Sequence, residues 1–106
     1  MTPLVAVAKL HALPGKEDEA RAALQAVQLD THKESGCLLY ALHVDESDAR
    51  AFVMVEAWES DDALDSHIAS AYVQDLISRS PDLFTGPVDI QRLTALPNGD
   101  AKKGTV

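Results

Sequence analysis

The stretch Glu34-Ser35-Gly36-Cys37-Leu38-Leu39-Tyr40 decides the fold, because the periodicity of the chain changes within it. Before it, from Glu17 to Lys33, apolar residues recur at helical spacing, and acidic residues occupy the first turn, where the helix dipole favours anions. After it, Cys37 to Val44 alternates in character, which predicts a strand. Gly36 is expected just beyond the helix C-terminus, where glycine is the preferred residue.

Two further strands are predicted on either side of this unit. Leu4 to Leu10 is a short apolar run closed by Pro14-Gly15, which favours a strand over a helix. Ala51 to Trp58 alternates again and is expected to form a hairpin with the preceding strand through a longer polar loop at Asp45 to Asp48. Alternation predicts that one face of Ala51 to Trp58 carries Phe52, Met54, Glu56 and Trp58, and that one face of Cys37 to Val44 carries Leu38, Tyr40, Leu42 and Val44.

A second helix is predicted after Ser60, whose hydroxyl can cap the helix N-terminus. Its apolar stripe continues beyond Ala71 after a bend, and Ser80-Pro81 is expected to stop it. A last strand follows at Val88 to Leu96. The order is β-α-β-β-α-β, so we predict an α+β, ferredoxin-like fold with a four-stranded antiparallel sheet. The domain is expected to span 1–96, and 97–106 to form a flexible C-terminal tail.

A homodimer is also predicted from the strands. Two helices cover only one face of a four-stranded sheet, whereas these strands carry apolar residues on both faces. A second copy of the chain is the simplest cover for the other face, because one patch then serves both protomers.

Composition limits the partners. The chain has 106 residues and a formal net charge of −8, which disfavours nucleic acid and anionic membranes. No apolar run approaches the ~20 residues of a membrane span, and no signal peptide is expected. Cys37 is the only cysteine, so a disulfide within the chain is excluded, which fits a cytoplasmic location.

The chain resembles the antibiotic biosynthesis monooxygenase domain family. The resemblance rests on Glu34-Ser35-Gly36-Cys37 leading to Tyr40, on the strand from Phe52 to Glu56-Ala57-Trp58, and on Ala63-Leu64 before His67. It implies a dimeric α+β barrel with a pocket between sheet and helices in each protomer. It also implies oxidation of a quinol-like or phenolic small molecule by molecular oxygen, without metal or flavin.

The resemblance leaves other activities open. Similar domains degrade haem, isomerise small signalling sugars, or have no known activity. The haem-degrading branch carries an asparagine on the first strand and a histidine further along the second helix, but this chain has no asparagine before Asn98 and no histidine in Val73 to Ser80. The alternatives to a monooxygenase are therefore a non-catalytic dimeric small-molecule-binding domain and an isomerase or lyase of small carbonyl metabolites.

His67 and Glu56 are the candidate catalytic residues. An imidazole at His67 could remove a phenolic proton near neutral pH, or it could be a structural polar group packed on Trp58. Glu56 lies in an otherwise apolar strand, where a carboxylate needs a partner. It could act as a base, orient His67, or form an ion pair with Arg92, Arg50 or a partner chain.

Three aromatic residues are candidates for substrate binding. Trp58 and Tyr40 could form a flat pocket wall, or pack in the core, and Tyr72 could gate the pocket, donate a hydrogen bond, or lie on the surface. No metal site is predicted, because His67 has no second ligand at helical spacing. No flavin or nucleotide cofactor is predicted, because no glycine-rich phosphate loop follows a strand. Cys37 is expected to be a small core residue rather than a nucleophile.

Overall fold

The computed structural model describes residues 3–106. Its elements, in chain order, are β1 (Leu4–His11), α1 (Glu17–Thr31), β2 (Cys37–Asp45), β3 (Asp48–Trp58), α2 (Asp61–Ile68), α3 (Ala71–Leu83) and β4 (Asp89–Thr94). The sheet has the order β2-β3-β1-β4, and every neighbouring pair is antiparallel. The predicted ferredoxin-like α+β fold is confirmed.

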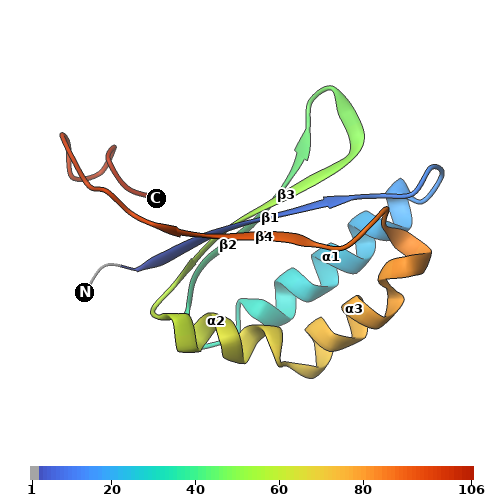
Figure 1. Ribbon diagram of the computed structural model, residues 1–106, viewed down its shortest axis with the longest axis horizontal. Helices are drawn as coiled ribbons and strands as arrows, with labels where there is room; N and C mark the ends of the chain where they lie inside the picture. The colour runs from blue at the N-terminus through green and yellow to red at the C-terminus, as the bar shows by residue number, and fades with distance from the viewer. Residues whose placement is uncertain (1–2) are drawn as a thin grey trace.

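All three helices cover the same face of the sheet (Figure 1). The face predicted for β3 is confirmed, since Phe52, Met54, Glu56 and Trp58 are all buried. In the register of the sheet, Glu56 stands between Tyr40 of β2 and Ala6 of β1. Ala6 and Ala8 are small, so the middle of the sheet offers less side-chain volume to the helices than its flanks do.

The second helical segment is broken where a bend was expected, but it does not stop at Ser80-Pro81. α2 ends at Ile68, α3 begins at Ala71, and Pro81 lies inside α3, which continues to Leu83. Proline lacks the N–H that would donate to the carbonyl four residues before it, and its ring crowds that carbonyl. The last turn still closes around it, because the Phe84 N–H donates to the Ser80 carbonyl at 2.8 Å.

The expected role of Gly36 as a helix cap is wrong. α1 ends at Thr31, and Gly36 does not have a positive φ. The glycine is needed for close approach instead, since a Cβ at this position would lie 2.6 Å from the Cβ of Ala63. Gly36 therefore lets the start of β2 pack directly against α2.

Two expectations about β2 also need correction. The alternation is interrupted at its start, where a register shift pairs Cys37 with Trp58 and leaves Leu38 exposed. Cys37 consequently packs against the core, as expected for its small side chain. The hairpin to β3 has a tight turn at Glu46-Ser47 in place of the longer loop.

The other face of the sheet has no helix over it (Figure 1). It carries Val5 and Val7 of β1 and Val53 and Val55 of β3, which are all only partly buried. Beyond β4, residues 97–106 contain no helix or strand and are all exposed. Within residues 3–106, no helix has the length and apolar character needed to cross a membrane.

Candidate active site

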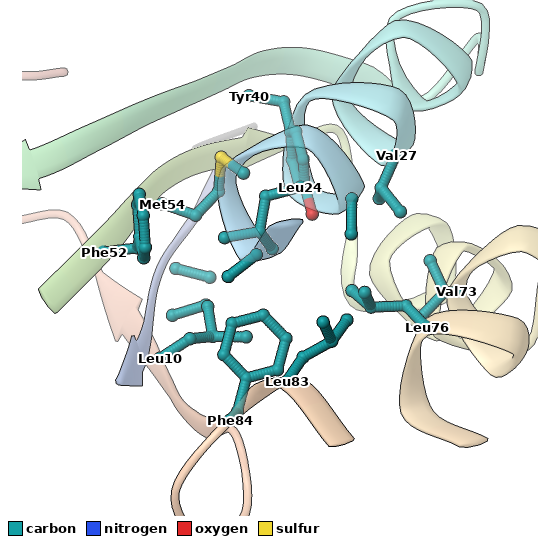
Figure 2. Packing of buried hydrophobic residues seen from close by; sticks show 14 of the residues in the cluster. Leu10, Leu24, Val27, Tyr40, Phe52, Met54, Val73, Leu76, Leu83 and Phe84 are labelled. Atoms are coloured by element: carbon teal, nitrogen blue, oxygen red, sulfur yellow. The ribbon is translucent and has the colours of Figure 1, made fainter. Parts of the chain in front are cut away.

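A cavity of about 80 Å³ lies between the helix-covered face of the sheet and the helices. Its walls are mostly apolar side chains of α1, α3 and the sheet, which point toward one another in Figure 2. Three polar residues complete the lining, namely Tyr40, Glu56 and His67. The small residues in the middle of β1 help to explain why this space is left open, because the core side chains around it cannot fill it.

His67 is held rigidly at the wall of this cavity. It lies in the last turn of α2, whose N-terminus is capped by Ser60 as predicted, through a bond from the Ala63 N–H at 3.1 Å. Only 4% of His67 is exposed, and its Nδ1 lies 2.8 Å from Oε2 of Glu34. A carboxylate there favours the tautomer with the proton on Nδ1, which leaves Nε2 as an acceptor.

Tyr72 bonds to the same carboxylate from the start of α3. Its hydroxyl donates to Oε2 of Glu34. Burial, followed by this hydrogen bond, raises the pKa of Tyr72 to about 12. Tyr72 is therefore a neutral donor in the physiological range, and Glu34 joins two side chains that come from different helices.

Glu34 also connects the site with solvent. Its side chain is 21% exposed and lines a polar hollow on the surface together with Gly36, Glu59 and Ser60. The carboxylate thus has His67 and the cavity on one side and water on the other.

Glu56 has a different environment in the middle of β3. It is only 3% exposed, and its Oε1 accepts a hydrogen bond of 2.9 Å from Nε1 of Trp58. Burial raises the pKa of Glu56 to about 7, against the smaller opposing effect of the Trp58 bond. Burial thus favours the protonated form of the Glu56 carboxyl.

Neither arginine considered as an ion-pair partner neutralises Glu56. Arg92 bonds to Asp61 and Asp65, at 3.0 and 2.6 Å. The Arg50 side chain donates to the Ala12 carbonyl at 2.9 Å. The predicted ion pairs of Glu56 with Arg92 and with Arg50 are therefore wrong. The prediction that Glu56 orients His67 is also wrong, because Glu34 bonds to the His67 ring.

The aromatic candidates lie around His67 but differ in their access to the cavity. Tyr40 lines it, with its ring centroid 5.2 Å from that of His67. Trp58 is 0% exposed, and its ring centroid lies 4.7 Å from that of His67, but Trp58 does not line the cavity. Burial, and then the charge of Glu56, raise the pKa of Tyr40 well above its ordinary value. The substrate-binding roles of Tyr40, Trp58 and Tyr72 stay predictions.

Glu34 was missed as a site residue, although it begins the stretch that decides the fold. It is separated from His67 by 33 positions and lies between two elements, so no periodicity connects them. A glutamate beside a glycine in a loop is ordinarily a solvated residue. The available signal was the need of a buried histidine for a carboxylate partner, which names the type of residue but not its position.

The remaining side chains add no other reactive centre to this cavity. In residues 3–106, no group of three or more histidine, cysteine or acidic residues could hold a metal ion. Burial, followed by the charges of Glu34 and Glu56, raises the pKa of the Cys37 thiol. Because the thiolate is the nucleophilic form, this environment lowers the reactivity of Cys37.

Fold and cavity together define a class of protein, a ferredoxin-like α+β domain with an enclosed site between sheet and helices. Residues 3–79 match the family model for antibiotic biosynthesis monooxygenases, and the chain belongs to this family. The resemblance found in the sequence is thereby confirmed.

Two relatives and one solved structure match most of this chain. "Putative monooxygenase Rv0793" of Mycobacterium tuberculosis is 29% identical over 100 residues, which cover 94% of this chain and 98% of that protein. "Uncharacterized protein sll1783" of Synechocystis is 30% identical over 84% of this chain, and the match spans only 60% of that protein's length. The crystal structure of PA3566 from Pseudomonas aeruginosa superposes with a TM-score of 0.85 at 32% identity, covering 91% of this chain and 96% of that one.

Proposed function

We propose that this protein is a cofactor-independent monooxygenase that oxidises a quinol-like or phenolic small molecule with molecular oxygen. The observation that carries the proposal is a buried histidine, held by a carboxylate, at the wall of an apolar cavity. Membership of the antibiotic biosynthesis monooxygenase family supports the reaction type. The substrate class is an expectation from the sequence that the chemistry of the cavity supports.

His67 is the base in this proposal. With Nδ1 bonded to Glu34, Nε2 is free to accept the phenolic proton, and the carboxylate stabilises the imidazolium that forms. The phenolate then gives one electron to dioxygen, and the two radicals combine into a peroxide anion on a ring carbon that carries a hydrogen. The proton held by His67 returns to make the hydroperoxide, and loss of the ring hydrogen with the terminal hydroxyl as water breaks the O–O bond and leaves a quinone. Phenol and dioxygen become quinone and water, with no net change in protons.

The cavity favours a neutral ring over a phosphorylated or carboxylated ligand. None of its lining residues is a lysine or an arginine, so the cavity has no permanent positive charge to compensate a ligand that enters as an anion. For the alternative of an isomerase or lyase of small carbonyl metabolites, this argues against a phosphorylated substrate. Exposed Ile77 and Ile90, with Val88, line both the cavity and an adjacent apolar hollow, so a substrate larger than 80 Å³ can extend in that direction.

The protein acts as a homodimer in this proposal. The face of the sheet without helices is apolar at Val5, Val7, Val53 and Val55, and such a face is costly to leave in water. A second copy covers it by a two-fold axis, which needs only one self-complementary patch. Light scattering at micromolar concentration is expected to give twice the chain mass, and Val53→Lys with Val55→Lys is expected to give monomers. A monomeric wild type would contradict this part of the proposal.

The test of activity is oxygen uptake with a panel of quinols and phenols, combined with product spectra. We expect His67→Ala to lower the rate about 10²–10⁴-fold, the usual contribution of a positioned base. Glu34→Gln retains the size of the side chain but loses its charge, and is expected to lower the rate about 10–100-fold. Treatment with a chelator and removal of flavin are expected to change nothing.

Asp30→Asn is the matched control for Glu34→Gln, because it removes an acidic charge near the end of α1 that pairs only with exposed Lys33. Its rate is expected to equal that of the wild type. Full activity of His67→Ala would place the base elsewhere. Absence of oxidation with every compound, together with measurable binding, would favour the small-molecule-binding domain.

A further inference from the structure

We propose that Glu56 meets the ligand as a neutral carboxylic acid that donates a hydrogen bond into the cavity. The site then offers one acceptor, at His67, and one donor, at Glu56, so it selects a ring that carries both a hydroxyl group and a second, uncharged oxygen. The ligand class deepens the proposed function and rests on it, whereas the protonation of Glu56 does not.

The hydrogen bonds around Glu56 are too few for an ionised carboxylate. A carboxylate has about four acceptor sites, and burial is costly when they are empty. Among residues 3–106, the Glu56 carboxyl has one hydrogen-bond partner, the indole N–H of Trp58. A neutral acid needs fewer partners, so this environment fits the protonated form.

Trp58 also determines which oxygen keeps the proton. An indole N–H is only a donor, and it donates to Oε1 of Glu56. The carbonyl oxygen of a carboxylic acid is its better acceptor, so Oε1 takes the carbonyl role. The hydroxyl role falls to Oε2, the oxygen that has no partner within the described chain. Because Glu56 lines the cavity, this O–H is the donor available to a ligand.

The charged and titratable groups near Glu56 do not change this assignment. β2 contributes Tyr40 and Cys37, the loop before it contributes Glu34, and α2 contributes His67. The residues of β1, α1 and α3 that line the cavity are all apolar. Arg92 of β4 is separated from Glu56 of β3 by β1, where Ala6 is the register partner of both. The guanidinium of Arg92 donates hydrogen bonds to Asp61 and Asp65. His67 is the one lining group whose protonation would favour an ionised Glu56.

Trp58 provides a direct readout, because it is the only tryptophan and bonds to Glu56. We expect its fluorescence to change with a midpoint near pH 7, as burial raises the pKa of Glu56 to about 7. Glu56→Gln mimics the neutral acid and is expected to abolish this transition. His67→Gln removes the imidazole that packs against Trp58 and is expected to retain the transition.

Two outcomes of the titration would overturn the proposal. One is a transition that persists in Glu56→Gln and disappears in His67→Gln, since it would then belong to the histidine. The other is a midpoint at the ordinary carboxyl value, which would mean that Glu56 is ionised at neutral pH. Both measurements are independent of any activity, so they stand even if no compound of the oxygen-uptake panel is oxidised.

The ligand class is tested with two probes of similar size, 4-hydroxyacetophenone and 4-hydroxybenzoate. At slightly acidic pH the first carries a neutral carbonyl and the second a carboxylate. We expect the wild type to bind the ketone at least about tenfold more tightly, a difference on the scale of one buried hydrogen bond to a ligand. Ketone binding is expected to weaken above the midpoint of the fluorescence transition in the wild type, but not in Glu56→Gln.

Equal binding of the two probes, or binding of neither, would overturn the ligand class. Binding of the ketone without oxidation of any phenol would leave the role of Glu56 intact and reject the monooxygenase. Oxidation of phenols, together with ketone binding that has the same pH dependence in the wild type and in Glu56→Gln, would support the monooxygenase and reject the role of Glu56. The two proposals can therefore fail separately.

Discussion

Glu34 and Glu56 carry the same side chain near the same histidine, yet their surroundings are opposite. Glu34 lies in the loop before β2, and about a fifth of its side chain is exposed to solvent. Its carboxylate accepts hydrogen bonds from His67 and Tyr72. Glu56 is in the middle of β3, is almost completely buried, and accepts only from Trp58. The number of donors and the access to water suit the first carboxyl to carry a charge and the second to hold a proton.

Trp58 connects the two regions. Its indole N–H bonds to Glu56, and its ring lies 4.7 Å from that of His67, which in turn contacts Glu34. A change at Trp58 should therefore affect both carboxyl environments, whereas a change at Tyr72 should affect only one. The predictions below use this difference, in order of expected size.

Trp58→Ala is expected to lower the free energy of unfolding by about 3–5 kcal/mol, because it empties the largest fully buried position of the core. Urea denaturation measures the loss. Trp58→Phe keeps an aromatic ring at this position but loses the five-membered ring with its N–H, and is expected to cost about 1–3 kcal/mol, in part through the unsatisfied Glu56. A loss below about 1 kcal/mol for Trp58→Ala would place the ring at the rim instead of the core.

Stability is expected to fall with rising pH through Glu56. Because burial raises the pKa of Glu56 to about 7 in the folded protein, from an ordinary value of 4.5, the folded state binds more protons than the unfolded state between these values. The free energy of unfolding then decreases from pH 5 to pH 8, by up to about 3 kcal/mol from this group. The pH dependence of the free energy of unfolding of Glu56→Gln should lack this part of the slope, and equal slopes would show that the pKa of Glu56 is not raised in the folded protein.

Gly36→Ala is expected to cost about 1–3 kcal/mol, because the new methyl group would overlap the Cβ of Ala63. The same clash would push β2 away from α2 and separate Glu34 from His67, so histidine chemical shifts in NMR spectra should change as well. Adding Ala63→Gly to Gly36→Ala makes room and should recover part of the loss. If Gly36→Ala is as stable as the wild type, the loop adjusts freely and does not set the distance between Glu34 and His67.

Tyr72→Phe is expected to have the smallest effect, about 0.5–1.5 kcal/mol, the net contribution of a single hydrogen bond. Glu34 keeps its bond with His67 and its contact with water, so the fluorescence transition of Trp58 should not move. A shift of that transition in Tyr72→Phe would mean that the two carboxyl environments are coupled more strongly than the contacts indicate.

Much of the fold followed from patterns in the chain. The alternation of β3 correctly predicted that Phe52, Met54, Glu56 and Trp58 share a buried face, and the capping of α2 by Ser60 was also correct. Errors arose where a local rule competed with packing. The position of Gly36 in the sequence predicted a helix cap, but the glycine is required there because α2 approaches closely at Ala63. Pro81 was assigned as a stop, although α3 continues beyond it because the following turn closes.

The candidate site shows the same division. The family resemblance and the chemistry of imidazole marked His67, and a carboxylate in an otherwise apolar strand marked Glu56, because such a group needs a partner. Their partners required the folded chain, since Glu34 is 33 positions from His67, and Glu56 bonds to Trp58 along its own strand face instead of to Arg92 or Arg50. Periodicity is a local property that sets helices, strands and buried faces, whereas hydrogen-bond partners and pKa values depend on distances between segments that only packing brings together.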